Sequence, residues 1–209
     1  MQPYAHALTS ARLGRRNWLD DLPIHEFMDI AKHACPDLRH RIVLHNVDLG
    51  PELAAMAFPD HPDARSVALL HVRQDLRRSP TVADWFDCCD LDRLPRLRAN
   101  AATGRRVVKD AANYLKLADE APVQDIWSFL TLPSRIADNV GDRANSLLMN
   151  GVGPILARAI FGPPRKVPRR GGGETIFDAS WVCEGMIVAA TGHIPSLSRI
   201  LDCFDERAL

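Results

Sequence analysis

The sequence predicts a mainly α-helical protein built from two similar helical units packed together. Apolar residues recur at helical spacing, strand-like alternation is scarce, and the chain repeats part of itself in order. Of 209 residues, 46% are hydrophobic and 25% charged, so the chain can bury a core. These observations favour a folded helical protein with a duplicated plan.

Helix starts place five helices in the first half of the chain. Pro23 follows an acidic pair, and proline is common in the first turn of a helix. Pro36 opens a second helix, Gly50-Pro51 ends it and starts a third, residues 64–77 suit a fourth, and Ser79-Pro80-Thr81 caps a short fifth. The apolar stripes are Ile24, Phe27, Met28 and Ala31; Leu38, Ile42 and Val43; Leu53, Met56 and Ala57; and Val82, Trp85 and Phe86.

Residues 22–58 resemble residues 121–161, and a second block of matches follows after an insertion. Helices share leucine and alanine freely, but they do not readily share Gly-Pro and two further prolines in one order. We therefore expect an internal duplication, with copies at 1–95 and 96–209. The matched pairs include Pro23 with Pro122, Asn46 with Asn150, Gly50-Pro51 with Gly153-Pro154, Val67 with Val182, Pro80 with Pro195, and Asp87-Cys88 with Asp202-Cys203.

The insertion, residues 162–178, contains proline, arginine and three consecutive glycines, which predicts a surface loop. Arg165, Lys166, Arg169 and Arg170 make it locally basic. One hypothesis is that this loop contacts a protein partner. The alternative is a solvated connector.

Seven of the eight histidines lie in the first copy, and the diverged second copy lacks their counterparts. A site needed once would be retained once, whereas drift of independent polar positions is the plainer alternative. The aligned changes are His25 to Gln124, His40 to Ala144, His45 to Met149 and His71 to Met186.

Imidazoles and carboxylates from several helices can build a metal site in a helical bundle. His25, Asp29 and His33 are spaced by four residues, and so are His71 and Asp75, which places each set on one helix face. The donor types suit Zn²⁺, Mn²⁺ or Fe²⁺ without separating them. The candidate metal ligands are His25, His33, His40, His45 and His71.

If the site is catalytic, metal-assisted hydrolysis of an anionic substrate is the default class, because a bound ion activates water. Asp29 or Asp75 would act as ligand or base, and Arg39 would clamp the anion. The sequence contains no GxSxG, Walker A or GxGxxG motif. A pH-sensitive histidine cluster is a third hypothesis.

The segments LPIHEFMDIAKH, DLRHRIVLHN, HVRQDL and SPTVADWF resemble, in this order, a family of short uncharacterised domains common in bacteria and their phages. The resemblance covers residues 3–86 and implies no reaction. The lack of a recognised catalytic motif favours, as an alternative to an enzyme, a non-catalytic interaction protein, for example a phage-related or mobile-element factor that binds a host protein. Positions matching the pattern are His25, His33, Arg39, His40, His45, Asn46, His71 and Asp84.

Charge and hydropathy exclude some classes of partner. Twenty-six basic and twenty-six acidic residues give no net charge, which argues against a general nucleic-acid binder. No apolar stretch is long enough to span a membrane, and the N-terminal residues lack a signal-peptide pattern. Five cysteines without CxxC spacing indicate reduced thiols, so we expect a cytoplasmic protein.

Overall fold

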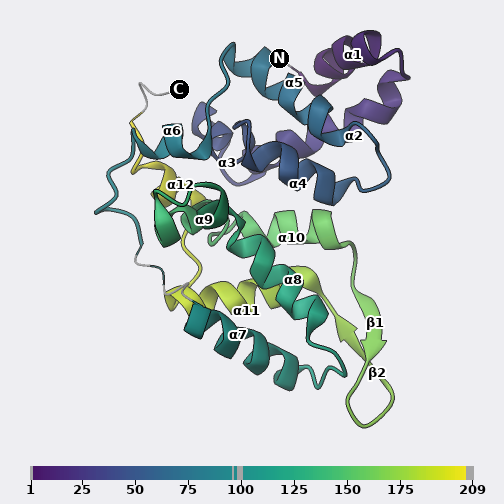
Figure 1. Cartoon of the computed structure of the whole chain (residues 1–209), viewed down its shortest axis with the longest axis vertical. Helices are drawn as coiled ribbons and strands as arrows, with labels where there is room; N and C mark the ends of the chain where they lie inside the picture. Colours follow the sequence, from purple (N-terminus) through teal and green to yellow (C-terminus); the bar gives the residue numbers. More distant parts are fainter. Residues whose placement is uncertain (1, 96, 98–100, 206–209) are drawn as a thin grey trace. The chain divides into compact units, whose positions relative to one another are not determined.

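The computed structural model describes residues 2–95, 97 and 101–205, and it is mainly helical, as predicted (Figure 1). The chain divides into two compact units. Unit 1 contains the residues up to Asp90 together with those from Leu201 onward. Unit 2 contains residues Leu91–Ile200.

Four helices form the body of unit 1. Helix α2 packs against α1 and α5, and α4 packs against α5. Short 3₁₀ and α segments connect α2 to α4, and a capping box formed by Thr81 and Asp84 starts α6. The bounds are α1 (Pro3–Gly14), α2 (Trp18–Met28), η1 (Ile30–His33), η2 (Leu38–His40), α3 (Arg41–Leu44), α4 (Leu49–Ala57), α5 (Ala64–Leu76) and α6 (Val82–Phe86).

Three boundaries in unit 1 differ from the sequence-based expectation. Helix α1 was not predicted. Helix α2 begins at Trp18, because the Asn17 side chain accepts a hydrogen bond from the Leu19 N–H, so Pro23 lies inside the helix. The helix expected from Pro36 is replaced by η2 and α3, and Asp37 caps the former by accepting from the Arg39 N–H.

Unit 2 is also built from helices. Helix α11 packs against α7, α8 and α10. The run Met186–Ala190, whose periodicity allowed either strand or helix, lies within α11. The bounds are α7 (Ala101–Tyr114), α8 (Ala121–Leu130), α9 (Leu132–Ile136), η3 (Gly141–Leu147), α10 (Gly153–Phe161), β1 (Arg165–Pro168), β2 (Glu174–Phe177), α11 (Ala179–Thr191) and α12 (Leu197–Leu201).

The insertion at 162–178 forms an antiparallel hairpin of β1 and β2 rather than an irregular loop. Gly171, Gly172 and Gly173 turn the chain with φ values of +89°, +101° and +78°, a region that side-chain-bearing residues rarely adopt. The ladder pairs Arg165 with Phe177 and Pro168 with Glu174.

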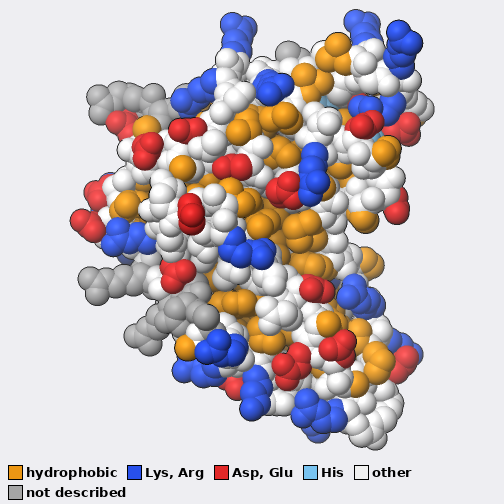
Figure 2. Space-filling model, viewed as in Figure 1, with side chains coloured by type: hydrophobic (Ala, Val, Ile, Leu, Met, Phe, Trp, Pro, Cys, Tyr) orange, Lys and Arg blue, Asp and Glu red, His pale blue; other side chains and the backbone are white. Residues whose placement is uncertain are grey.

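Charges of both signs are interspersed on the face drawn in Figure 2, and histidine is nearly absent from it. Five of the histidines of unit 1 are buried: His6, His25, His40, His45 and His71. Among the described residues, no helix combines the length and the apolar character needed to cross a bilayer.

Candidate metal centre

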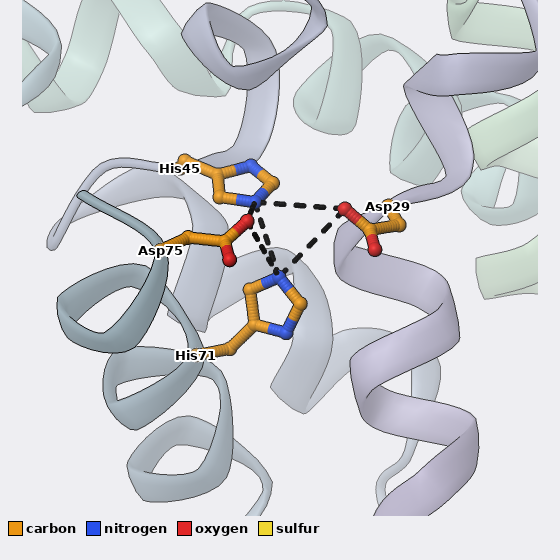
Figure 3. A group of neighbouring side chains, drawn as sticks. All are labelled: Asp29, His45, His71 and Asp75. Atoms are coloured by element: carbon orange, nitrogen blue, oxygen red, sulfur yellow. Dashed lines mark hydrogen bonds and ion pairs between the residues drawn. The ribbon is translucent and has the colours of Figure 1, made fainter. Parts of the chain in front are cut away.

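Four side chains of unit 1 meet at one point: Asp29, His45, His71 and Asp75 (Figure 3). Each offers one nitrogen or carboxylate oxygen, and these four atoms all lie within 4.8 Å of one another. The side chains are almost fully buried, since Asp29 is 7% exposed, Asp75 1%, and both histidines 0%.

The pattern of α5 explains how His71 and Asp75 reach the centre. The buried residues of this helix recur at helical spacing and define its inner face. His71 belongs to that face, and Asp75 follows it by one helical turn. The helix residues buried on this face are Ala64, Val67, Ala68, His71 and Val72.

Two helix ends supply the other pair of side chains. Asp29 directly follows α2, whose final residues Phe27 and Met28 are buried. His45 directly follows α3, whose residues 42–44 are wholly buried and carry the next side chain inward. Burial of these apolar neighbours therefore places polar groups in the core.

The distances suit a shared ion. His45 Nε2 lies 3.1 Å from His71 Nε2, 3.3 Å from Asp75 Oδ2 and 3.7 Å from Asp29 Oδ1. His71 Nε2 lies 3.8 Å from Asp29 Oδ1 and 3.8 Å from Asp75 Oδ2. Bonds of about 2.0–2.2 Å to one ion place tetrahedral donor atoms roughly 3.3–3.6 Å apart.

Burial lowers the pKa of each of the three innermost histidines. The pKa of His25 falls to about 3, with neighbouring His71 and His6 adding to the burial effect. The pKa of His45 falls to about 4, although Asp75 opposes the shift. The pKa of His71 is also lowered. These imidazoles are therefore neutral near pH 7, the form that binds a metal.

Both aspartates are ionised. Burial raises the pKa of Asp29, but its polar and charged neighbours, Lys32 among them, lower it by more. Burial also raises the pKa of Asp75, and hydrogen bonds from His45 and His6 outweigh that effect. Two carboxylates and neutral imidazoles thus provide oxygen and nitrogen donor atoms for a cation.

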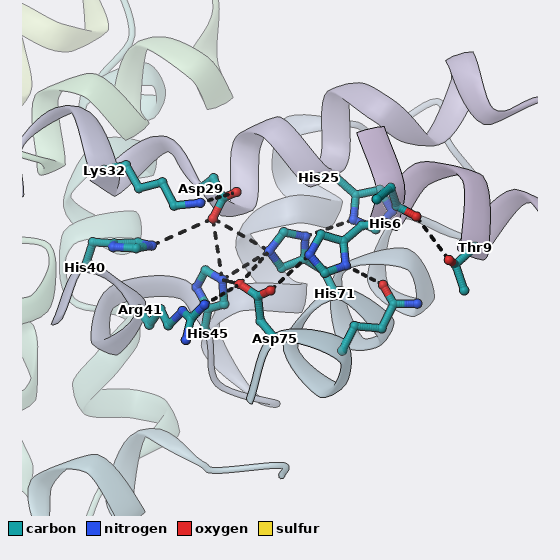
Figure 4. Close-up of polar contacts among 12 residues, drawn as sticks. His6, Thr9, His25, Asp29, Lys32, His40, Arg41, His45, His71 and Asp75 are labelled. Atoms are coloured by element: carbon teal, nitrogen blue, oxygen red, sulfur yellow. Dashed lines mark hydrogen bonds and ion pairs between the residues drawn. The ribbon is translucent and has the colours of Figure 1, made fainter. Parts of the chain in front are cut away.

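Further polar groups surround the four (Figure 4). His40 Nδ1 donates to the Asp37 carbonyl, and its buried Nε2 has no hydrogen-bond partner in the described part of the chain and lies 3.8 Å from Asp29 Oδ1. Arg41 contacts Asp75 at 3.2 Å, and Lys32 contacts Asp29 at 2.6 Å. His40 is therefore a candidate fifth ligand, because its buried Nε2 lies beside the donor oxygen of Asp29.

The structure brings most of the candidate residues together. The centre is formed by Asp29, His45, His71 and Asp75, and His40 borders it. His25 contacts His71 at Nδ1, on the side of the ring away from the centre. His33 is exposed on η1 and lies outside the group.

The positions of two arginines and of His6 differ from the sequence-based expectation. Arg39, the expected anion clamp, contacts Asp37 and Asp202 on the surface, whereas Arg41 contacts the centre. His6 was not a candidate, because α1 was not predicted; its Nε2 donates to Asp75 Oδ1 at 3.0 Å. Its place in an apolar stretch, PYAHAL, was the available signal.

Burial limits what can reach the centre. A cavity of about 640 Å³ lies between α7 and α11 of unit 2, and none of the four side chains lines it. The near-zero exposure of the donors favours an ion held by protein groups over one that receives a bulky substrate.

The lowered histidine pKa values predict that metal-free unit 1 loses stability in mild acid. The pKa of His25 and His45 is about 3 and about 4 in the folded protein, below the ordinary 6.5, so the unfolded chain takes up protons first as the pH falls. We expect the free energy of unfolding, measured by urea titration in EDTA, to be constant above about pH 7 and to decrease from about pH 6.5 towards pH 4.

A His25→Asn variant provides the comparison for this profile, since it removes one titrating group from the buried set. Its slope with pH should be shallower than that of the wild type. A wild-type profile that is flat between pH 7 and pH 4.5 would contradict the expectation.

The fold and the site together define a helical domain with a buried histidine–aspartate centre. Residues 1–94 match the model of a domain family of unknown function, DUF6915. All four central residues lie in this stretch. No curated protein and no solved structure matches the sequence. The comparison thus supports an uncharacterised domain family and carries no activity.

Proposed function

We propose that unit 1 binds one divalent transition-metal ion through Asp29, His45, His71 and Asp75. The observation that carries the proposal is the environment of Asp29 Oδ1. This buried, charged oxygen has no hydrogen-bond partner among the described residues, and three imidazole Nε2 atoms lie 3.7–3.8 Å from it. Burying a carboxylate oxygen without a donor of its own is costly, and Lys32 contacts only the other oxygen of this carboxylate, Oδ2, at 2.6 Å.

Two imidazoles and two carboxylates suit Zn²⁺, Mn²⁺ or Fe²⁺. Four protein ligands fill a tetrahedral site, and His40 would complete a five-coordinate one. The ion would join the end of α2, the end of α3 and the C-terminal half of α5, three elements that are separate in the sequence. Its role in this proposal is to hold the domain together.

Burial bears on the hydrolase hypothesis. Metal-assisted hydrolysis needs an open coordination position for water and a path for an anionic substrate. The four donors are at most 7% exposed, which supports a closed site. Arg41 and Lys32 supply positive charge beside the donors, so hydrolysis of an anionic substrate stays a prediction.

Metal analysis tests the proposal. We expect untagged protein to bind about one equivalent of Zn²⁺, Mn²⁺ or Fe²⁺, measured by titration calorimetry and elemental analysis, with a rise in the thermal midpoint as metal is added, because an ion that binds only the folded state stabilises it. Less than about 0.1 equivalent after addition of all three metals would refute it, since a preformed site of four donors should fill.

We also propose that unit 2 derives from a copy of unit 1 that has lost the ligands. Helices α5 and α11 have 13 residues each, and their first and last residues match in the repeat alignment, as do those of α6 and α12. The prolines of Gly50-Pro51 and Gly153-Pro154 both lie in the first turns of helices, α4 and α10.

Backbone packing at the repeated glycines supports this proposal. A Cβ atom added to Gly50 would lie 1.9 Å from the Leu44 carbonyl oxygen, and one added to Gly153 would lie 2.1 Å from that of Leu148. The positions that match the ligands hold buried apolar residues instead: Met149 for His45, Met186 for His71 and Ala190 for Asp75. One metal ion per chain, rather than two, is therefore expected.

A further inference from the structure

We infer that a hydrogen-bonded relay from α1 through His25 fixes which nitrogen of His71 carries its proton, so that His71 presents a lone pair to the centre. The inference deepens the proposed function, on which it rests for its purpose but not for its structural test. Ser10 and His25 are then positioning residues.

The relay begins at Ser10. Its Oγ donates to the Ala7 carbonyl at 3.1 Å, and a carbonyl oxygen can only accept. Since a hydroxyl has one proton, the contact between Ser10 Oγ and His25 Nε2 at 3.0 Å needs the proton of the imidazole. His25 therefore carries a proton on Nε2.

His25 transmits this choice to His71. His25 is fully buried between His6 and His71, and no carboxylate lies within ion-pair distance of it among the described residues, so a doubly protonated ring would be a buried, uncompensated charge. A neutral ring with its proton on Nε2 accepts at Nδ1. His71 Nδ1, 2.9 Å away, must donate to it.

His71 then has its proton on Nδ1 and a lone pair on Nε2. This Nε2 is the atom that faces His45, Asp29 and Asp75 in Figure 3. A metal ion entering the centre would displace no proton from His71. A hydrogen bond made by the ring nitrogen that does not bind the metal orients a metal-binding histidine. Removal of such a bond changes metal affinity about 10- to 100-fold.

His45 supplies an internal contrast. Its Nδ1 is buried without a hydrogen-bond partner among the described residues, whereas its Nε2 can donate to Asp75 Oδ2 or His71 Nε2. In the metal-free protein His45 therefore holds its proton on Nε2, opposite to His71. Metal binding would move that proton to Nδ1, while the proton of His71 would stay in place.

Nitrogen NMR of the metal-free protein tests the relay directly. In protein with ¹⁵N-labelled histidine, long-range ¹H–¹⁵N spectra distinguish a protonated ring nitrogen from one with a lone pair. We expect a proton on Nε2 of His25 and on Nδ1 of His71, both at pH 7.5 in EDTA. A proton on Nε2 of His71 would overturn the inference whether or not the protein binds metal.

Two substitutions at His25 separate positioning from packing. In His25→Asn the amide oxygen stands where Nδ1 stood and can still accept from His71, whereas His25→Leu offers no acceptor. We expect the zinc dissociation constant to rise about 10- to 100-fold in His25→Leu and to stay within about threefold of wild type in His25→Asn. Equal weakening in both variants would show that the ring only fills space, and would overturn the inference.

Ser10→Ala covers the case in which His25→Leu does not fold, because it keeps the His25 ring and removes the acceptor of His25 Nε2 together with the bond to the Ala7 carbonyl. Thr9→Ala is its matched control, since Thr9 Oγ1 also donates to a carbonyl of α1, that of Ala5, but lies outside the relay. We expect weaker zinc binding and loss of the fixed His71 tautomer in Ser10→Ala alone. An unchanged tautomer in Ser10→Ala would contradict the relay, whereas absence of Zn²⁺, Mn²⁺ and Fe²⁺ binding in the wild type would refute the proposed function and leave the NMR result to decide the relay.

Discussion

Replacing Asp29 with asparagine is expected to weaken binding of a divalent cation on the order of 100-fold or more, because asparagine has nearly the same size as aspartate but carries no negative charge. Four-ligand structural zinc sites bind with about 10–16 kcal/mol, so one ligand accounts for roughly 2–4 kcal/mol. The same variant should lose most of the metal-induced rise in thermal midpoint. Calorimetric titration and thermal unfolding with and without zinc measure the two effects.

The control for this experiment is Asp20→Asn. Asp20 lies on α2, nine residues before Asp29, and it is exposed. The Asp20→Asn substitution removes the same charge without changing the donors, so the zinc affinity of this variant should match that of wild type within about twofold. Equal weakening in both variants would point to general electrostatic attraction, and unchanged binding in Asp29→Asn would remove Asp29 from the ligand set.

Gly50→Ala is expected to destabilise unit 1 by about 3 kcal/mol or more, since overpacking of a core costs about 1–3 kcal/mol and here the obstacle is backbone. The new Cβ would lie 1.9 Å from the Leu44 carbonyl oxygen and 3.0 Å from the tip of Met28. The chain between Leu44 and α4 would have to move, and His45 lies in that stretch. Both the thermal midpoint and zinc binding should therefore fall.

For Gly185→Ala we expect the opposite effect on the stability of the protein. Gly185 lies inside α11, and a Cβ there would meet nothing within 4 Å. Alanine should stabilise this helix by about 0.5–1 kcal/mol, because glycine is the weaker helix former. Thermal unfolding of both variants, followed by circular dichroism, makes the comparison. Similar midpoints for Gly50→Ala and wild type would show that the backbone at Leu44 yields easily.

Local spacing predicted some neighbours in the centre correctly and failed for others. His71 and Asp75 share the inner face of α5, as their four-residue spacing predicts for a regular helix. The same argument grouped His25, Asp29 and His33, but α2 ends at Met28 and the chain continues as the 3₁₀ segment η1. That change of helical period turns His33 to the surface, while Asp29 at the junction faces the centre.

Arg39 and Arg41 show a second limit. Two arginines flank His40, and nothing in the sequence distinguishes them. In the fold Arg39 pairs with Asp37 and with Asp202, which is 163 residues away, whereas Arg41 reaches Asp75. The choice depends on which acids the folded chain brings near each arginine.

The sequence by itself determined the helical class, four of the five helices marked in the first half, and the residue types of the centre. Each of these follows from local rules of spacing, capping and side-chain chemistry. Only the tertiary structure decided that Asp29, His45, His71 and Asp75 share one point, that His6 contacts Asp75, and that His33 lies outside the group. Such convergence depends on how α1, α2 and α5 pack, and packing is set by apolar burial summed over segments far apart in the chain.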